Sequence, residues 1–381
     1  MVSRTNHAQN TPPKHPGITL EEKLSLKGML QVELAKRTGI TAKTINLIIK
    51  GTAPISPETA MRLDNVLDEP ADFWLNLEAK YQAQKLNTIK AGNLESELPF
   101  LEKINFKEMI KKGWINKKET SLEQLKALYS FFGVSSVNQL SPVWSQLEVN
   151  YRTSTKYKQN HFNIMAWLRQ GEIKASEIPR QPYNLAKFKE SLKECRKLTD
   201  EPFDLVYVEM QKLCANAGVT VVFIPELKGV ATSGAAHWLD KDTALIQLSL
   251  RGKRNDMFWF NFFHEAGHII LHGRKEQFID NQRQGLMSSG SDDDESPYFT
   301  EENKLKEAEA DEFSGDFLIP RKSFSQFVLE TKIDKNSIQD FALSVGVSPG
   351  IVVGQLQSKG YLDWHKHNSL KKTYDFPPNM M

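Results

Sequence analysis

Residues 258–273 read FWFNFFHEAGHIILHG, an apolar run of helical length that carries two histidines and a glutamate near its middle. Burying such groups in a core is costly unless something pairs with them. His264 and His268 lie four residues apart, so on a helix they share one face, roughly 6 Å apart between their Cβ atoms. Both imidazoles can then reach a single ion. Glu265 points about 100° round the helix and can reach a water at that ion, as the general base of the HExxH arrangement does.

A zinc ion in such a site needs a third protein ligand. His272 continues the four-residue spacing, but a helix rise of ~12 Å separates it from His264, so we expect it at the surface or supporting a ligand. The better candidate is the downstream segment KEAEADEF, in which Glu307 and Asp311 share a helix face. Glu307 is predicted to bind the ion, and Asp311 to hydrogen-bond a ligand histidine and orient it. The other acidic residues of this segment, Glu309 and Glu312, are expected to be solvated charges.

Two alternatives to a catalytic zinc site remain open. An HExxH match in a chain with nine histidines arises by chance at roughly the per cent level, and a bound metal can be purely structural. The match lies on an apolar helix directly after a strand, however, and a second helix supplies a carboxylate at the right phase. This favours a Zn²⁺ centre that hydrolyses peptide bonds. His237 and Tyr298 are candidates for stabilising the oxyanion, although nothing in the sequence positions either of them.

Length and composition limit the class of protein. A chain of 381 residues is long enough for two or three domains, and a net charge of +2 means that any nucleic-acid site is local. The two cysteines, Cys195 and Cys214, are far apart in the sequence, which favours a reducing compartment and no disulfide framework. Cys214 has the helical spacing of a core residue. No apolar run reaches membrane length and the N-terminus lacks a signal peptide, so we expect a cytoplasmic protein with no membrane partner.

A second functional pattern lies at residues 31–51, QVELAKRTGITAKTINLIIKG, which has the spacing of a helix-turn-helix. Gly39 supplies the positive φ of a tight turn, and Thr41 is a natural N-cap for the second helix. Residues 1–50 hold eight Lys and Arg against three Glu, which suits a DNA backbone. The alternative is an ordinary helical hairpin with a solvated face. The predicted contacts to base edges and phosphates are Thr41, Lys43, Thr44, Asn46 and Lys50.

A similar spacing recurs near the C-terminus, in FALSVGVSPGIVVGQLQSKG at residues 341–360. Residues 342–346 match residues 35–39, so the same turn is expected between two helices. The second helix here is rich in Gly and Val and carries no basic residue between Ser348 and Gln357. We therefore predict a helix-turn-helix that is used for packing and not for DNA.

Two parts of the chain resemble known families. Residues 15–85 resemble the HigA-type antitoxins of the Cro/cI helix-turn-helix class, on the HPG start and the segments ISPETAMRLDNVL and FWLNLEAKY. Residues 248–273 together with DEFSGDFLIP resemble the ImmA/IrrE metallopeptidase family. The segment VGVSPGIVVGQLQSKGYL extends the likeness to a fused form that carries both parts. The acidic insert at 288–303, SSGSDDDESPYFTEEN, is long for this family, which bears on the openness of the active site.

The resemblance implies His264, His268 and Glu307 as zinc ligands and Glu265 as the base. It also implies DNA binding, autorepression of an operon and often a toxin partner. We therefore predict a transcriptional regulator, a HigA-like antitoxin and autorepressor, with a zinc-dependent metalloendopeptidase domain that cuts itself, a toxin or a partner regulator. In the alternative hypothesis the zincin-like domain is not catalytic and only binds a toxin or senses a ligand. Because one helix-turn-helix covers a half-site, we expect a homodimer on double-stranded DNA with an inverted-repeat operator.

The apolar pattern predicts a mainly α protein with a small β-sheet (α+β). Short β-branched runs predict strands at 219–224 and 243–250, with a further strand and a turn between them. The segment 288–303 has six acidic residues and no Lys or Arg, so we expect it to be mobile or to act as a lid beside the cleft. The expected parts are a disordered arm at 1–17, a helix-turn-helix domain at 18–90, a helical linker region at 91–180, a zincin-like peptidase domain at 181–325 and a C-terminal packing element at 326–381.

Overall fold

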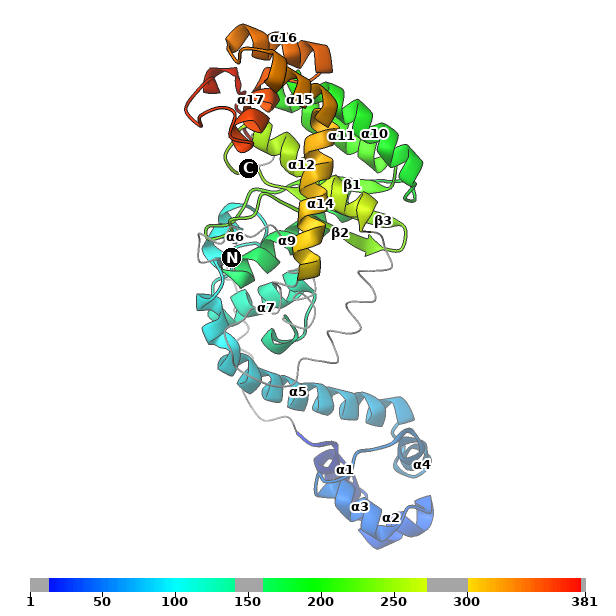
Figure 1. The fold of residues 1–381 in the computed structure, drawn as a ribbon. Coiled ribbons are helices and arrows are strands. Elements are labelled where there is room, and N and C mark those ends of the chain that lie inside the picture. The colour runs from blue at the N-terminus through cyan, green and yellow to red at the C-terminus, as the bar shows by residue number, and fades with distance from the viewer. Residues whose placement is uncertain (1–13, 141–159, 273–300, 378–381) are drawn as a thin grey trace, which may run out of the picture. The chain divides into compact units, whose positions relative to one another are not determined.

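The computed structural model of the chain describes residues 14–140, 160–272 and 301–377 (Figure 1). The chain divides into two compact units, Met1–Leu98 and Pro99–Met381. In agreement with the predicted fold class, helices dominate both units, and the described part of the second contains a small three-stranded sheet. Most of the predicted N-terminal arm, the residue Tyr298 and the acidic segment up to residue 300 lie outside the described residues.

The first unit is a set of helices around a small apolar core. Leu20, Leu34, Ile45, Leu63 and Trp74 pack together there and are at most 1% exposed. Burying each such side chain contributes roughly 1.5–3 kcal/mol relative to leaving it in water. The helices of this unit are α1 (Pro16–Leu26), α2 (Gln31–Thr38), α3 (Ala42–Ile49), α4 (Pro57–Leu67) and α5 (Ala71–Glu97).

The second unit opens with short helices that lead to the sheet. A capping box starts one of them, α7, where the side chains of Thr120 and Glu123 each bond the backbone N–H of the other. The helices before the sheet are η1 (Leu98–Glu102), α6 (Phe106–Lys111), α7 (Ser121–Phe132), η2 (Val137–Gln139), α9 (His161–Ser176), α10 (Leu185–Lys197), η4 (Leu198–Asp200) and α11 (Phe203–Ala215).

Helix α9 covers one face of the sheet. The indole Nε1 of Trp167 donates to the carbonyl of Ile224 at 2.9 Å, and Gln247 Nε2 donates to the carbonyl of Trp167 at 2.7 Å. All three residues lie in the second unit. Helix α9 and the sheet therefore belong to one unit, which begins at Pro99, and the boundary predicted at residue 180 stays a prediction.

The sheet consists of β1 (Val219–Phe223), β2 (Gly234–Asp240) and β3 (Thr243–Leu248), close to the strands that the sequence predicts. The strand order is β1-β3-β2, with β1 parallel and β2 antiparallel to β3. Among the strands that the described residues form, β2 pairs only with β3. As far as the described ranges extend, one side of β2 is therefore a sheet edge.

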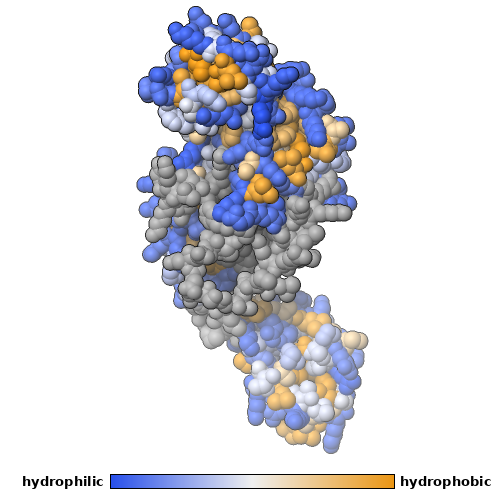
Figure 2. Space-filling model, in the orientation of Figure 1, coloured by the Kyte–Doolittle hydropathy of each residue, from blue (hydrophilic) through white to orange (hydrophobic). Residues whose placement is uncertain are grey.

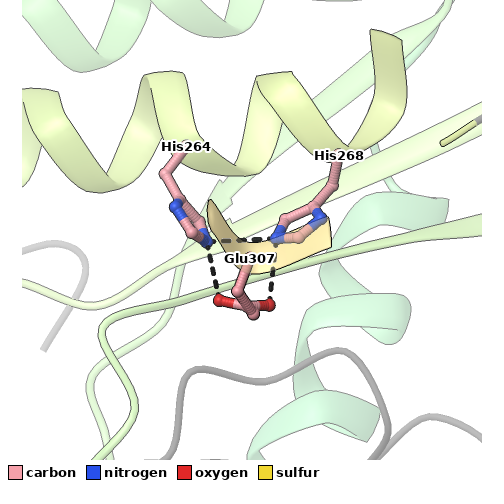
Figure 3. A group of neighbouring side chains, drawn as sticks. All are labelled: His264, His268 and Glu307. Carbon is pink, nitrogen blue, oxygen red and sulfur yellow. Dashed lines mark hydrogen bonds and ion pairs between the residues drawn. The ribbon is translucent and has the colours of Figure 1, made fainter. Parts of the chain in front are cut away.

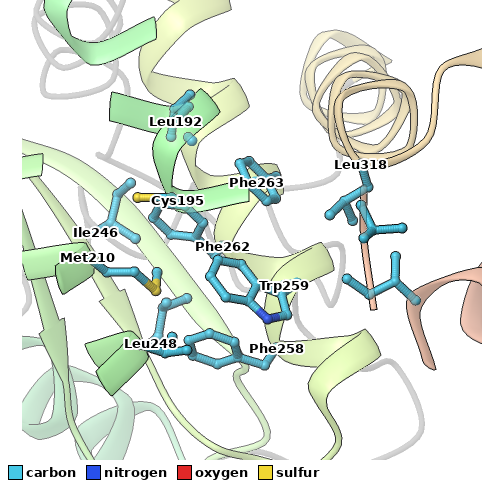
Figure 4. Close-up of a cluster of buried hydrophobic side chains, with 14 of the residues drawn as sticks. Leu192, Cys195, Met210, Ile246, Leu248, Phe258, Trp259, Phe262, Phe263 and Leu318 are labelled. Carbon is cyan, nitrogen blue, oxygen red and sulfur yellow. The ribbon is translucent and has the colours of Figure 1, made fainter. Parts of the chain in front are cut away.

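Helix α12 (Asn255–Leu271) packs its aromatic side chains on the other face of the sheet (Figure 4). Phe258, Trp259, Phe262 and Phe263 are at most 4% exposed and form the centre of the main core. Cys195 and Cys214 belong to the same core and are fully buried, as the spacing around Cys214 predicts. The remaining helices are α14 (Glu301–Leu318), α15 (Arg321–Glu330), α16 (Lys335–Val345), α17 (Pro349–Ser358) and η5 (Asn368–Leu370).

The C-terminal helices combine a buried and a solvent-exposed side. Ile338 and Ala342 of α16 are fully buried, whereas Leu343 is 83% exposed and Leu329 of α15 is 84% exposed. Figure 2 shows hydrophobic residues on the surface at this end of the second unit. In the described ranges no single helix is long and apolar enough to cross a membrane, and only the bent pair α16–α17 passes that test, by length and composition alone.

Candidate functional site

Helices α12 and α14 bring His264, His268 and Glu307 together (Figure 3). The two histidines lie on successive turns of α12, and their Nε2 atoms are 3.0 Å apart. Glu307 of α14 places one carboxylate oxygen 3.3 Å from His264 Nε2 and the other 3.2 Å from His268 Nε2. The structure thus groups three potential metal ligands whose donor atoms all lie within 4.8 Å of one another.

The separations between these donor atoms fit a zinc ion. Two donors bound at about 2.0–2.1 Å in tetrahedral geometry lie about 3.3 Å apart. The two Nε2 atoms are 3.0 Å apart, and each lies 3.2 or 3.3 Å from a different oxygen of Glu307, which is close to that value. Two imidazoles and one carboxylate are also a donor set that zinc takes in open sites.

The charges around the site favour a cation. Burial lowers the pKa of His264, but hydrogen bonds to Asp311 and Glu307 outweigh burial and raise this pKa to about 9. Burial raises the pKa of Glu307, yet the hydrogen bonds to His264 and His268 outweigh it and hold this pKa well below its ordinary value. The cluster therefore stabilises a positive charge beside Glu307. A metal ion can supply that charge in place of a proton, because histidine ligands bind in their neutral form.

Close packing of α12 on α14 sets the position of Glu307. A Cβ added to Gly267 would lie 3.1 Å from Phe313 Cδ1 and 3.3 Å from Ala310 Cα, so a larger residue would push the helices apart. Asp311, one turn after Glu307, contacts His264 Nδ1 at 2.8 Å through Oδ1. The predicted contact between Asp311 and a histidine of the HExxH segment is therefore present.

The structure decides between the two expectations for His272 and differs from the expectation for Glu309. His272 is 8% exposed and its Nδ1 lies 3.0 Å from His268 Nδ1, so it supports a candidate ligand, as one of the two expectations has it, and does not lie at the surface. Glu309 is not simply a solvated charge, because its Oε2 lies 3.0 Å from His272 Nε2. The expectation for Glu309 used only its position around its own helix, which turns it away from Glu307. In the structure the end of α12 lies close enough for His272 to contact Glu309. Glu312 is exposed and bonds the guanidinium of Arg321.

Glu265 lies against the edge strand of the sheet. It is 2% exposed, and a Cβ added to Gly234 of β2 would lie 2.6 Å from its Oε1 and 2.9 Å from its Cγ. Only glycine leaves room for this carboxylate. Gly234 is not among the site residues predicted from the sequence, although a glycine inside a strand signals a close approach of another group.

His237 is not placed to stabilise an oxyanion at this centre. Side chains alternate along a strand, so His237 points away from the face on which Gly234 meets Glu265. Its Nε2 lies 3.6 Å from Glu172 Oε1, on helix α9. His237 is 3% exposed and belongs to the packing between α9 and the sheet.

In the first unit, α2 and α3 form the predicted turn. Gly39 has a φ of 70°, and Thr41 Oγ1 accepts a hydrogen bond from the backbone N–H of Thr44 at 3.1 Å. The two hydroxyls also share a hydrogen bond of 2.8 Å. Thr41 and the side chains of Lys43, Asn46 and Lys50 are exposed, and Thr44 is partly exposed. The structure thus places all five predicted DNA contacts on or beside one helix, with four of them open to solvent.

Arg62 of α4 is a further residue of this turn that the sequence analysis missed. Its Nη1 donates to the carbonyl of Gly39 at 3.2 Å, and its Nη2 bonds Glu58 at 2.6 Å. The pairing of Glu58 with Arg62 follows from helical spacing, but nothing local shows that the arginine reaches across to the turn.

Comparison with known families identifies both parts of the chain. Residues 20–74 match the model of a helix-turn-helix domain, and residues 214–356 match that of the IrrE N-terminal-like domain. The chain joins a helix-turn-helix domain to an IrrE-like domain. The IrrE-like domain is of a metallopeptidase type, and its match contains the sheet, the metal-ligand cluster and most of α17. It continues past residue 325, where the sequence analysis set the end of the peptidase domain.

Known proteins that are similar to this chain include proteins of the HigA family. The virulence-associated protein A' of Dichelobacter nodosus is 32% identical over 75 residues, which are 19% of this chain and 65% of that protein. The chain therefore spans less than two thirds of the length of this curated relative. An addiction module antidote protein of the HigA family from Coxiella burnetii is 32% identical over 23% of this chain and 96% of its own, with a TM-score of 0.21. The Pseudomonas aeruginosa antitoxin HigA, solved with the higBA promoter, is 34% identical over 22% and 89%, with a TM-score of 0.20.

Proposed function

We propose that this chain is a DNA-binding regulator whose IrrE-like domain is a zinc-dependent endopeptidase. The observation that carries the proposal is the arrangement of His264, His268 and Glu307 around one point, with Glu265 on the next position of the same helix. In this proposal the two histidines and Glu307 are the zinc ligands, and Asp311 orients His264 through its Nδ1.

Glu265 would act as the general base and acid. A zinc ion held by the three ligands would lower the pKa of a water towards ~7 and polarise a carbonyl. Glu265 would accept a proton from the attacking water and pass it to the leaving amine. Glu265 is 2% exposed, which shields this carboxylate from bulk water, and Gly234 gives it the space it needs.

The neighbouring edge strand supports a peptide as the substrate. β2 passes Glu265 at Gly234, and its outer side pairs with no other strand of the described residues. An extended peptide can add to such an edge through main-chain hydrogen bonds, which read the backbone and not the side chains. A peptide bond would thereby be held beside the proposed base.

Metal analysis and cleavage assays on wild type and three variants test the enzyme proposal. Wild type should retain about one zinc per chain, and Glu307→Ala should lose it, because two ligands rarely hold the ion. Glu265→Gln should keep the zinc and lose all cleavage of the protein itself and of neighbouring gene products. Glu312→Ala, an exposed acidic residue of the same helix, is the matched control and should behave as wild type. Full zinc in Glu307→Ala would sink the ligand assignment, and zinc without any cleavage dependent on Glu265 would favour the non-catalytic binding module.

For the first unit we propose binding to an inverted-repeat operator as a homodimer, in the manner of a HigA-like autorepressor. The exposed polar face of α3 supports this, because it offers ammonium, amide and hydroxyl groups to phosphates and base edges. A toxin encoded beside it is a candidate partner. Footprinting on the protein's own promoter region, with the first unit's Lys43 and Asn46 replaced by alanine, tests the proposal.

A further inference from the structure

Two residues outside the proposed ligand set continue the chain of contacts from His268. His268 Nδ1 lies 3.0 Å from His272 Nδ1, and His272 Nε2 lies 3.0 Å from Glu309 Oε2. We propose that His272 and Glu309 are positioning residues that hold the ring and the tautomer of His268 for metal binding. This inference rests on the proposed zinc centre.

When His268 binds a metal, the protons on His268, His272 and Glu309 can be arranged in only one way. The Nε2 of His268 faces Glu307 and His264, so this atom carries the lone pair for the metal. A neutral imidazole then carries its proton on Nδ1, and His268 Nδ1–H donates to His272 Nδ1. His272 must in turn carry its proton on Nε2, where the carboxylate of Glu309 accepts it.

The two histidines of the HExxH segment are therefore supported in different ways. His264 Nδ1 meets a carboxylate directly, 2.8 Å from Asp311 Oδ1. His268 reaches its carboxylate, Glu309, through a second imidazole. A carboxylate that accepts from the outer nitrogen fixes the ring and raises the basicity of the metal-binding nitrogen. His272 transmits that effect to His268.

The contact between His268 and a carboxylate runs through His272 because of where the two helices meet. His268 lies one turn beyond His264 along α12, and no acidic residue of α14 in the described contacts meets its Nδ1 directly. Glu307 is occupied between the two Nε2 atoms and Asp311 is on His264. His272 is the C-cap residue of α12 and is 8% exposed, so its imidazole is held in place between His268 and Glu309.

Zinc affinity, measured by competition with a chromophoric chelator, tests the inference on the full chain. His272→Leu removes the acceptor and should weaken zinc binding roughly 10- to 100-fold, as loss of an outer hydrogen-bond partner does. His272→Asn should recover most of that loss, because the asparagine Oδ1 stands on Cγ as Nδ1 does and still accepts from His268, although it no longer transmits the effect of Glu309. Glu309→Ala should weaken binding, and Glu309→Gln, which keeps an acceptor oxygen, should restore it.

The absorption spectrum of the Co²⁺-substituted proteins gives a second readout that folding alone does not move. His272→Leu should change the ligand-field bands and His272→Asn should preserve them. Glu312→Ala on the same helix is the control and should match wild type in both measurements. Should His272→Leu not fold, as judged by circular dichroism, the Glu309 pair decides, since that side chain is 49% exposed. Wild-type affinity in Glu309→Ala and His272→Leu, or equal losses in His272→Asn and His272→Leu, would overturn the inference. A wild type that binds no zinc would overturn the proposed centre itself.

Discussion

The helix pairs α2–α3 and α16–α17 have the same local construction and different surroundings. In both pairs a glycine ends the first helix in the left-handed region, with a φ of 70° at Gly39 and 69° at Gly346. Ile45 and Val352 lie at corresponding positions, each six residues after its glycine, and both are fully buried. The turn and its inward residue are therefore local properties that two unrelated parts of the chain share.

The outer faces of the second helices are what differ. Lys43 and Asn46 of α3 and its C-cap residue Lys50 are exposed, whereas α17 packs against α12. A Cβ on Gly350 would lie 2.7 Å from Asn255 Oδ1, and one on Gly354 would lie 2.6 Å from Asp256 Oδ2. The glycines of α17 thus allow close approach to α12, and its composition suits a packing helix and not a DNA-reading one.

The largest expected effects come from the buried residues of each pair. Ile45→Ala and Leu356→Ala, both at positions that are fully buried, should each lower the free energy of unfolding by about 2–5 kcal/mol. The first should also abolish DNA binding and leave zinc retention intact. The second should reduce zinc retention and leave DNA affinity unchanged. Thermal unfolding followed by DNA titration and metal analysis checks this, and loss of both properties in either variant would contradict the division of roles.

Asn46→Ala should remove a base contact without changing the free energy of unfolding. We expect DNA affinity to fall by about 1–3 kcal/mol and preference at one base pair to relax. Ser358→Ala, an exposed polar residue on α17, is the matched control and should leave affinity unchanged. Gel-shift titrations against single-base variants of the operator measure both, and equal affinity of Asn46→Ala and wild type would remove this residue from the interface.

Replacing the turn glycine should lower the free energy of unfolding by similar amounts in the two pairs. Gly39→Ala and Gly346→Ala each force an alanine into the left-handed region, which costs about 1–2 kcal/mol. Neither position is crowded, because the nearest atoms to an added Cβ are guanidinium nitrogens of Arg62 at 3.4 Å and Arg196 at 3.8 Å. Denaturant unfolding of the two variants compares them. A much larger loss in one would show that its turn is also strained by its surroundings.

The smallest expected effect is the loss of one phosphate contact. Lys43→Ala should weaken binding to all DNA sequences alike and lower the slope of log affinity against log salt by about one unit. Lys335→Ala, on α16, changes the same charge in the other pair and should leave the slope as it is. Titrations at several salt concentrations measure the slopes. Identical slopes for Lys43→Ala and wild type would place this lysine away from the backbone.

Much of the fold and of the candidate site could be predicted because it is local. The four-residue spacing of His264 and His268 places them on one helix face by geometry alone, and so does that of Glu307 and Asp311. The turn at Gly39 and the N-cap at Thr41 follow from the conformational freedom of glycine and the hydroxyl of threonine. The strands followed from short β-branched runs bounded by turn residues.

Tertiary structure alone decided the contacts between segments that are distant in sequence. By itself, the sequence determined which residues share a helix face, where two of the three strands lie, and that α17 carries no basic residue. It could not show that Glu309 meets His272, that Gly234 makes room for Glu265, or that α9 packs on the sheet. These depend on how α12, α14 and β2 approach one another, and that approach is set by the packing of the whole core, which no periodicity within one segment encodes.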